Sequence, residues 1–191
     1  MNVDSMFAVP IAWTFLEDID IDELIDYGHK QLRPDNQSNF IDLDEEPIKS
    51  ISKIVTEKVN KVYNDCGFKH SQKLDNVWFN KGNPRPISNP HTHPKSFFVA
   101  ILYLSNPENN SGNLTLLNPN NSQDHFIPHD AIDHSISSPY TRMYTVVPFA
   151  EKLLVVHPAW IMHYVSQEAP EENRMSIAFN FSLDLPDGKE N

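Results

Sequence analysis

Hydrophobic residues recur at steps of three and four in the first third of the chain, which is the spacing of an amphipathic helix. The longest such run covers residues 47–66 and predicts a one-sided helix that lies against a sheet. A shorter helix is expected from Asp20, a suitable N-cap, to about Leu32, where the following Arg33-Pro34 pair ends it. We interpret Cys66, at the end of the longer stripe, as a small buried apolar residue.

After about residue 70 the pattern changes to short β-favouring runs separated by Asn, Pro, Gly and Ser. An earlier run, residues 6–16, is also typical of a strand, and Pro10 places it at a sheet edge or a bulge. Two helices followed by seven or eight short strands indicate an α+β protein whose strands form a double-stranded β-helix, a cupin-like jelly roll. The later strands are expected at residues 75–81, 95–104, 113–117, 143–148, 152–157, 163–167 and 174–183.

This pattern fits one domain over residues 1–191. Residues 1–70 would form an N-terminal support of two helices packed on one sheet, and residues 71–185 the jelly-roll core. A long polar connection, residues 118–140, interrupts the strands. Loops of this length in compact domains are usually functional or disordered, so we predict that residues 119–139 cover the functional pocket and are mobile without substrate. A solvated surface insertion is the alternative.

Composition excludes several classes of function. Fifteen Lys and Arg against 26 Asp and Glu give a formal net charge of −11, which repels phosphate backbones, so no nucleic-acid partner is expected. The sequence contains neither an apolar run of transmembrane length nor the basic and apolar regions of a signal peptide, so we expect a cytoplasmic protein without a membrane partner. The single cysteine excludes an internal disulfide and a thiolate zinc cluster.

Two histidines, His91 and His93, stand at the start of an apolar run that ends at Leu104. In an extended backbone, residues i and i+2 point to the same side, about 7 Å apart at Cα, so both imidazoles can reach one cation. A catalytic metal usually takes three protein ligands. His163 is the candidate for the third, because it opens a late strand after a turn at Pro158, where a jelly roll can bring it opposite the histidine pair.

Arg174 follows His163 by eleven residues and begins a strand in which Arg174, Ser176 and Asn180 share one face. An arginine on the inner face of such a strand needs an anion, because an unpaired buried guanidinium is costly. A resident Asp or Glu could supply it, and so could a ligand carboxylate held by bidentate hydrogen bonds. The residues alone leave both partners open.

Together these segments resemble the iron(II)- and 2-oxoglutarate-dependent dioxygenases. Residues 89–104 match a motif Asn-x-His-x-His-Pro…Tyr-Leu, and the segment 156–180 ends in Arg-x-Ser-x-x-Phe-Asn. Both motifs are similar to those of a bacterial and viral, prolyl-hydroxylase-like branch of that superfamily. The resemblance covers roughly residues 75–183.

The resemblance implies a jelly-roll oxidoreductase that hydroxylates an unknown small-molecule or peptide substrate, with release of succinate and CO2. Its cofactors would be Fe(II) and 2-oxoglutarate, and no catalytic residue is expected beyond the metal ligands. The implied iron ligands are His91, His93 and His163. The implied cosubstrate-binding residues are Arg174 and Tyr103, which would hold the C5 carboxylate, with Ser176 and Asn180. A homodimer is compatible with these features.

One residue departs from the superfamily's usual His-x-Asp/Glu…His pattern, because His93 occupies the second position. Three neutral imidazoles leave the site one negative charge short of the usual facial triad, and a nearby carboxylate could replace His93 as ligand. The alternatives are a cupin-like three-histidine metalloenzyme without 2-oxoglutarate and a non-catalytic jelly-roll binding or structural module. Binding of 2-oxoglutarate through Arg174 separates the dioxygenase from both, and metal content separates the other two.

Overall fold

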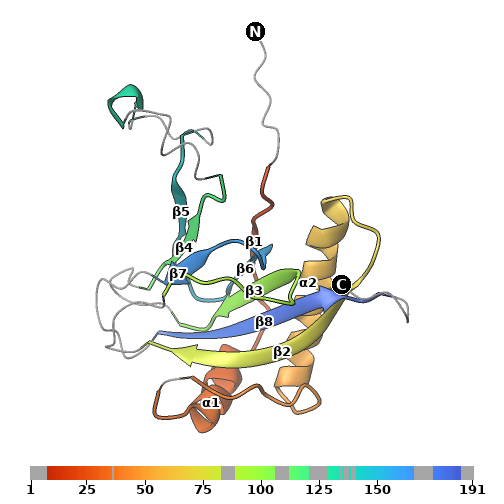
Figure 1. The fold of residues 1–191 in the computed structure, drawn as a ribbon. Coiled ribbons are helices and arrows are strands. Elements are labelled where there is room, and N and C mark those ends of the chain that lie inside the picture. The colour runs from red at the N-terminus through yellow and green to blue at the C-terminus, as the bar shows by residue number, and fades with distance from the viewer. Residues whose placement is uncertain are drawn as a thin grey trace.

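The computed structural model describes residues 8–35, 37–82, 89–105, 112–120, 129–133, 135, 138, 141–165 and 174–185. The expected helices and strands are present in these residues, most of them shorter than predicted. In chain order the elements are β1 (Ala12–Phe15), α1 (Ile21–Gln31), α2 (Ile48–Asp65), β2 (Gln72–Lys81), β3 (Phe98–Tyr103), β4 (Leu114–Leu117), η1 (His129–Ala131), β5 (Tyr144–Val147), β6 (Leu153–Pro158), β7 (His163–Val165) and β8 (Met175–Leu183) (Figure 1).

The strands form two antiparallel sheets. One has the order β1-β6-β3-β8-β2, and the other has the order β5-β4-β7. A hydrophobic cluster lies between the sheets and takes residues from both, as in a jelly roll. Its buried members are Tyr103, Leu114, Leu116, Val147, Phe149, Leu153, Val155 and Ile161. The α+β, double-stranded β-helix fold predicted from the sequence is therefore confirmed.

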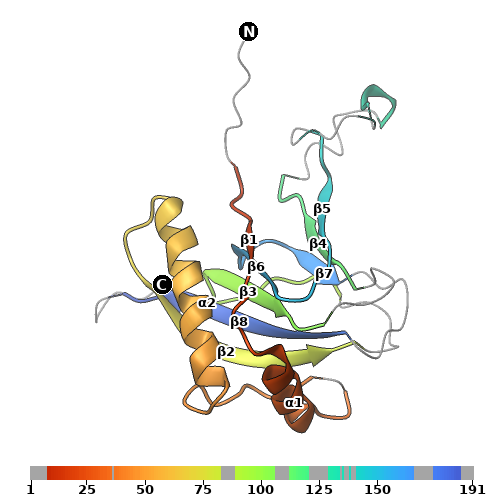
Figure 2. The ribbon, with the colours of Figure 1, turned by 180° about the vertical axis from the view of Figure 1, so that it is seen from behind.

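Helices α1 and α2 cover the other face of the five-stranded sheet, as the view from behind shows (Figure 2). The alternation of side chains along a strand explains this division. In β8, Met175, Ile177 and Phe179 pack with the helices, so Ser176 and Asn180 face the space between the sheets. Asp20 caps α1 as predicted, and its side chain accepts a 3.0 Å hydrogen bond from the Glu23 backbone N–H. Neither described helix has the length and apolar character needed to cross a bilayer.

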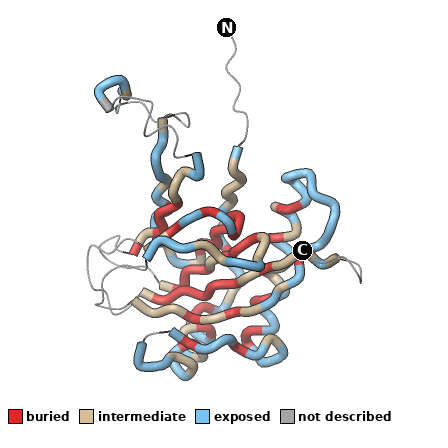
Figure 3. Tube along the Cα trace, viewed as in Figure 1, coloured by how far each residue is buried: buried red, intermediate tan, exposed pale blue. Residues whose placement is uncertain are grey.

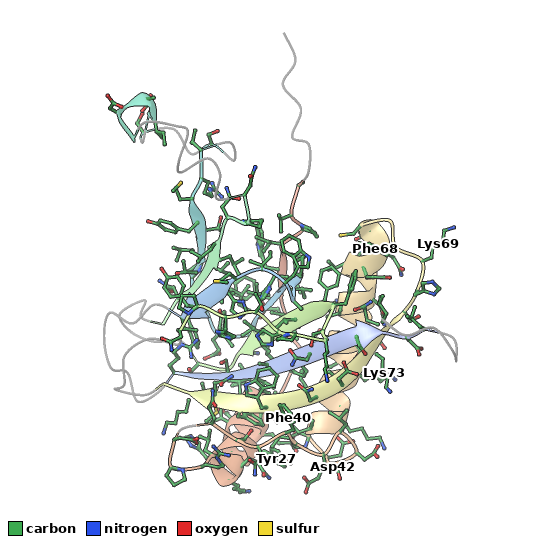
Figure 4. The ribbon with its side chains drawn as sticks, viewed as in Figure 1. Tyr27, Phe40, Asp42, Phe68, Lys69 and Lys73 are labelled. Carbon is green, nitrogen blue, oxygen red and sulfur yellow. The ribbon has the colours of Figure 1, made fainter. Side chains whose placement is uncertain are left out.

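The interpretation of Cys66 as a buried residue is wrong, because Cys66 is exposed at the C-cap of α2. The apolar stripe of the helix ends in buried Tyr63, one turn earlier. Gly67 adopts a left-handed conformation with φ of +86°, which terminates the helix. Phe68, labelled at this end of α2 in Figure 4, follows Gly67. Its ring stacks on the Tyr63 ring with centroids 4.6 Å apart, so Phe68 packs on the end of the stripe and Cys66 does not.

Most of the long connection, residues 119–139, lies outside the described residues. Its described part includes η1, which lies at the far end of the arm formed by β4 and β5 (Figure 1). That end of the arm is largely exposed, whereas the strand residues nearer the five-stranded sheet are buried (Figure 3). The idea that this connection covers the functional pocket stays a prediction.

Candidate metal centre and cosubstrate site

Backbone pairing between two distant segments brings His91, His93 and His163 together. His91 and His163 form an isolated antiparallel bridge, in which each backbone N–H donates to the carbonyl of the other at 2.9 and 3.0 Å. The His93 N–H donates to the Ala159 carbonyl at 2.9 Å. As a result, one ring nitrogen from each histidine lies within 4.8 Å of the other two. His163 is buried and His91 is exposed, so the cluster can be reached from the His91 side.

An oxygen atom accepts a hydrogen bond from the Nδ1 atom of each ring. The pairs are His91 with the Asn89 carbonyl at 2.8 Å, His93 with Asn180 Oδ1 at 2.8 Å, and His163 with the Ile161 carbonyl at 2.9 Å. Because these oxygens can only accept, each Nδ1 carries the proton and each Nε2 keeps a lone pair. The Nε2 atoms of His93 and His163 are only 3.3 Å apart. Converging Nε2 atoms with free lone pairs are suited to bind one divalent metal ion.

Asn180 orients one ring of the histidine cluster, that of His93. Its Nδ2 atom donates to Asn76 Oδ1 at 3.0 Å, and this bond turns the Asn180 oxygen toward His93. The resemblance had assigned Asn180 to the cosubstrate, whereas the structure places its side chain against a histidine of the cluster. Asn76 was not anticipated, because its alignment with Asn180 follows a register shift after Leu74 that the sequence pattern does not reveal.

Burial favours the neutral form of two imidazoles of the cluster, those of His93 and His163. Burial is the main cause that lowers the pKa of His163, to about 3. Burial also lowers the pKa of His93, against the opposing effect of the hydrogen bond to Asn180. Neutral rings present lone pairs instead of positive charge, which favours metal binding. Among the described residues no carboxylate belongs to the cluster, so His93 is not replaced there by an acidic side chain.

A second group of residues lies at the opposite end of the β3–β8 pair from Asn180, where Tyr103 pairs with Ser176. The Arg174 guanidinium carbon lies 4.9 Å from the centre of the Phe149 ring, and the Tyr103 ring lies 4.2 Å from the same ring. Arg174 Nε donates to the Gly112 carbonyl at 3.1 Å. Ser176 is buried opposite Tyr103 in the register of the two strands. These contacts hold Arg174 against the interior cluster without offering it a negative charge.

Arg174 is absent from the salt bridges of the described residues, which are Arg33–Asp35 and Lys61–Asp65. Burial lowers the pKa of Arg174, and proximity to Tyr103 opposes this. The Tyr103 hydroxyl is buried without a hydrogen-bond partner among the described residues, and burial raises its pKa to about 12. A cationic fork and a neutral hydroxyl donor therefore lie together without an anion, and a carboxylate would satisfy both.

A jelly roll that holds three converging imidazoles and a half-buried arginine without an acidic partner among the described residues has the layout of a non-haem metal oxygenase. Comparison with known families agrees. The family described as "Putative 2OG-Fe(II) oxygenase" matches residues 76–180, more than half of the chain, and the chain belongs to this family. The predictions of the family, of an oxidoreductase and of iron and 2-oxoglutarate as its cofactors are confirmed.

Solved structures with similar folds include a prolyl-4-hydroxylase from Pseudomonas putida, 14% identical over 91% of this chain and 92% of that chain, with a TM-score of 0.59. A viral collagen prolyl hydroxylase from Paramecium Bursaria Chlorella virus-1, in its 2OG complex, is 15% identical over 92% and 96%, with a TM-score of 0.60. The epimerase SnoN, in complex with Fe3+, alpha ketoglutarate and nogalamycin RO, is 11% identical over 96% and 88%, with a TM-score of 0.62. At such identities the likeness shows the fold. No curated protein matches the chain.

Proposed function

We propose that this oxygenase hydroxylates a small-molecule or peptide substrate, with iron held by His91, His93 and His163. In this proposal Arg174 and Tyr103 would hold the C5 carboxylate of 2-oxoglutarate by donating hydrogen bonds to it. Bound together, Fe(II) and 2-oxoglutarate supply the oxidation of the substrate, with succinate and CO2 as coproducts. The observation that carries the proposal is the half-buried Arg174 guanidinium without an acidic partner among the described residues, beside the unbonded Tyr103 hydroxyl.

The surface between the two polar groups supports this placement because it is apolar. Across strands β6, β3 and β8, Val155, Ile101 and Ala178 form one row in register. This row lies between the row that contains Asn180 and the row that contains Tyr103. Ile101 is partly exposed although β3 is the central strand. The order polar, apolar, polar matches a dicarboxylate whose charged ends are joined by methylene groups.

In the proposed complex the residues of the chain would bind the metal and the cosubstrate and orient their own side chains toward them. The oxygens bonded to the three Nδ1 atoms fix the direction in which the imidazoles present their lone pairs. Arg174 and Tyr103 donate to the carboxylate, and each charge-assisted hydrogen bond of this kind contributes about 1.5–3 kcal/mol. The exposed position of His91 leaves a side from which a substrate reaches the metal.

An anaerobic titration of 2-oxoglutarate into metal-loaded protein tests the proposal. Arg174→Lys keeps the charge but loses the bidentate fork, so it should weaken 2-oxoglutarate binding at least about tenfold, a loss of about 1.4 kcal/mol. Metal affinity should stay unchanged, since Arg174 is not a ligand. Arg33→Lys, in an exposed ion pair, is the matched control and should bind like the parent. An Arg174→Lys variant with parental affinity for 2-oxoglutarate would contradict the proposal. In a separate assay, succinate release by the parent protein across candidate substrates would test turnover.

A further inference from the structure

We propose that Gly112 is a positioning residue for Arg174. Its carbonyl group and its lack of a side chain together determine where the guanidinium lies. This inference rests on the proposed function, because it concerns the arginine that would hold the C5 carboxylate of 2-oxoglutarate. It adds a residue that touches neither the metal cluster nor the cosubstrate and acts only through Arg174.

Arg174 Nε donates a hydrogen bond to the Gly112 carbonyl at 3.1 Å. This bond engages one edge of the planar guanidinium. The terminal N–H groups are then directed away from that edge, in the orientation that a bidentate carboxylate needs. A backbone carbonyl suits this role because it orients the cation without neutralising it, as a carboxylate would.

The space beside the Gly112 Cα atom is occupied by the Arg174 side chain. A Cβ atom built on Gly112 would overlap Arg174 Nε and Cδ and would lie 3.4 Å from the guanidinium carbon. Arg174 therefore occupies the volume that any other residue type would fill with its side chain. Gly112 also has a φ of +75°, a left-handed conformation that favours glycine.

Phe149 restricts the position of the Arg174 side chain further. Its ring lies 4.9 Å from the guanidinium carbon, and its backbone N–H donates to Asn113 Oδ1 at 2.9 Å. Asn113, which follows Gly112, thus ties Phe149 to the same backbone segment. A side chain at position 112 would displace Arg174 from both contacts at once.

The chain provides a matched control for the substitution. Gly67 also has a positive φ, of +86°, but a Cβ atom at Gly67 would meet nothing within 4 Å. Gly112→Ala and Gly67→Ala therefore share the backbone strain and differ in the contact with Arg174. With protein loaded with Mn(II) under anaerobic conditions, we expect Gly112→Ala to weaken 2-oxoglutarate binding at least about tenfold and Gly67→Ala to leave it within about twofold of the parent. Both variants should bind Mn(II) like the parent.

A double-mutant cycle shows whether the effect passes through Arg174. In the Arg174→Lys background, Gly112→Ala should change the 2-oxoglutarate dissociation constant by less than about threefold. Parental affinity in Gly112→Ala, combined with weak binding in Arg174→Lys, would overturn the positioning role and leave the proposed function intact. Parental affinity in Arg174→Lys would instead show that the proposed function fails.

A second cycle covers the case in which Gly112→Ala folds poorly. Arg174→Ala removes the atoms that would overlap the new Cβ, so Gly112→Ala should lower the melting temperature less in that background than in the parent. An equal decrease in both backgrounds would mean that Gly112 is needed only for its own backbone conformation, and the inference would be wrong. This readout needs neither metal nor cosubstrate.

Discussion

Replacing Tyr103 by Phe removes one buried hydroxyl group and should change stability and ligand affinity in opposite directions. In the ligand-free protein the hydroxyl has no hydrogen-bond partner among the described residues, and the Tyr103 side chain is fully buried. A buried polar group without a partner costs about 1–3 kcal/mol. We therefore expect Tyr103→Phe to raise the free energy of unfolding of the metal-free protein by about 1 kcal/mol.

Binding of 2-oxoglutarate should respond in the opposite sense. In the proposed complex the Tyr103 hydroxyl donates to the C5 carboxylate, and a hydrogen bond to a charged group contributes about 1.5–3 kcal/mol. Tyr103→Phe should weaken 2-oxoglutarate binding about tenfold or more, since a factor of ten corresponds to about 1.4 kcal/mol. Urea unfolding of the metal-free protein and anaerobic titration of the Mn(II) form measure the two effects.

Tyr27→Phe is the matched control, because the Tyr27 hydroxyl donates to Glu45 Oε2 at 2.6 Å on the other side of the sheet (Figure 4). This variant should lose about 0.5–1.5 kcal/mol of stability and bind 2-oxoglutarate like the parent. A stability loss in Tyr103→Phe would refute the view that its hydroxyl lacks a partner in the free protein. Unchanged affinity for 2-oxoglutarate would remove Tyr103 from the cosubstrate site.

Three further predictions concern the metal, acid stability and the long connection. Single Ala variants of His91, His93 and His163 should each lose most of the Mn(II) affinity, and a variant with one tightly held equivalent would move the site elsewhere. Burial lowers the pKa of His157 from 6.5 to about 4. The contribution of His157 to the free energy of unfolding is therefore fully present above pH 6.5 and decreases as the pH falls toward 4, because the unfolded chain binds a proton in this range and the folded chain does not. His157→Phe should reduce that loss by roughly 1.4 kcal/mol per pH unit between pH 6.5 and 4, and identical pH dependence in urea unfolding would contradict this. Residues 119–139 should gain hydrogen-exchange protection when 2-oxoglutarate binds to the Mn(II) form, and unchanged protection throughout would count against a covering role.

Periodicity predicted most of the fold because burial follows it directly. The alternation in β8 was enough to separate Ser176 and Asn180 from the helix-facing residues. Motif spacing likewise brought the three histidines into one hypothesis before their positions were known. Cys66 was misplaced because periodicity does not state where a helix stops contributing to the core.

The supporting residues of the site could not be predicted in the same way. The contact between Asn76 and Asn180 depends on a register shift in β2, and the contact between Gly112 and Arg174 joins residues 62 positions apart. Asparagine and glycine, the residue types of Asn76 and Gly112, do not indicate a functional role by themselves. Their contacts depend on how segments far apart in the sequence pack together, and the pattern of a single sequence does not specify this packing.

The proposed set of three imidazole ligands would also affect how the metal and the cosubstrate depend on each other. A carboxylate in place of His93 would offset one of the two positive charges of Fe(II), whereas neutral histidines offset none. In the proposed complex the dianionic 2-oxoglutarate would bring negative charge to a cluster that has no carboxylate among the described residues, while Arg174 adds a positive charge. Charges near one another in a partly buried site interact strongly, so the cosubstrate should stabilise bound metal more here than beside a carboxylate ligand. Because coupling between two ligands is reciprocal, the metal must strengthen 2-oxoglutarate binding by the same factor. If His93 is a ligand as proposed, removal of 2-oxoglutarate should weaken metal binding, and a metal titration with and without 2-oxoglutarate measures this coupling.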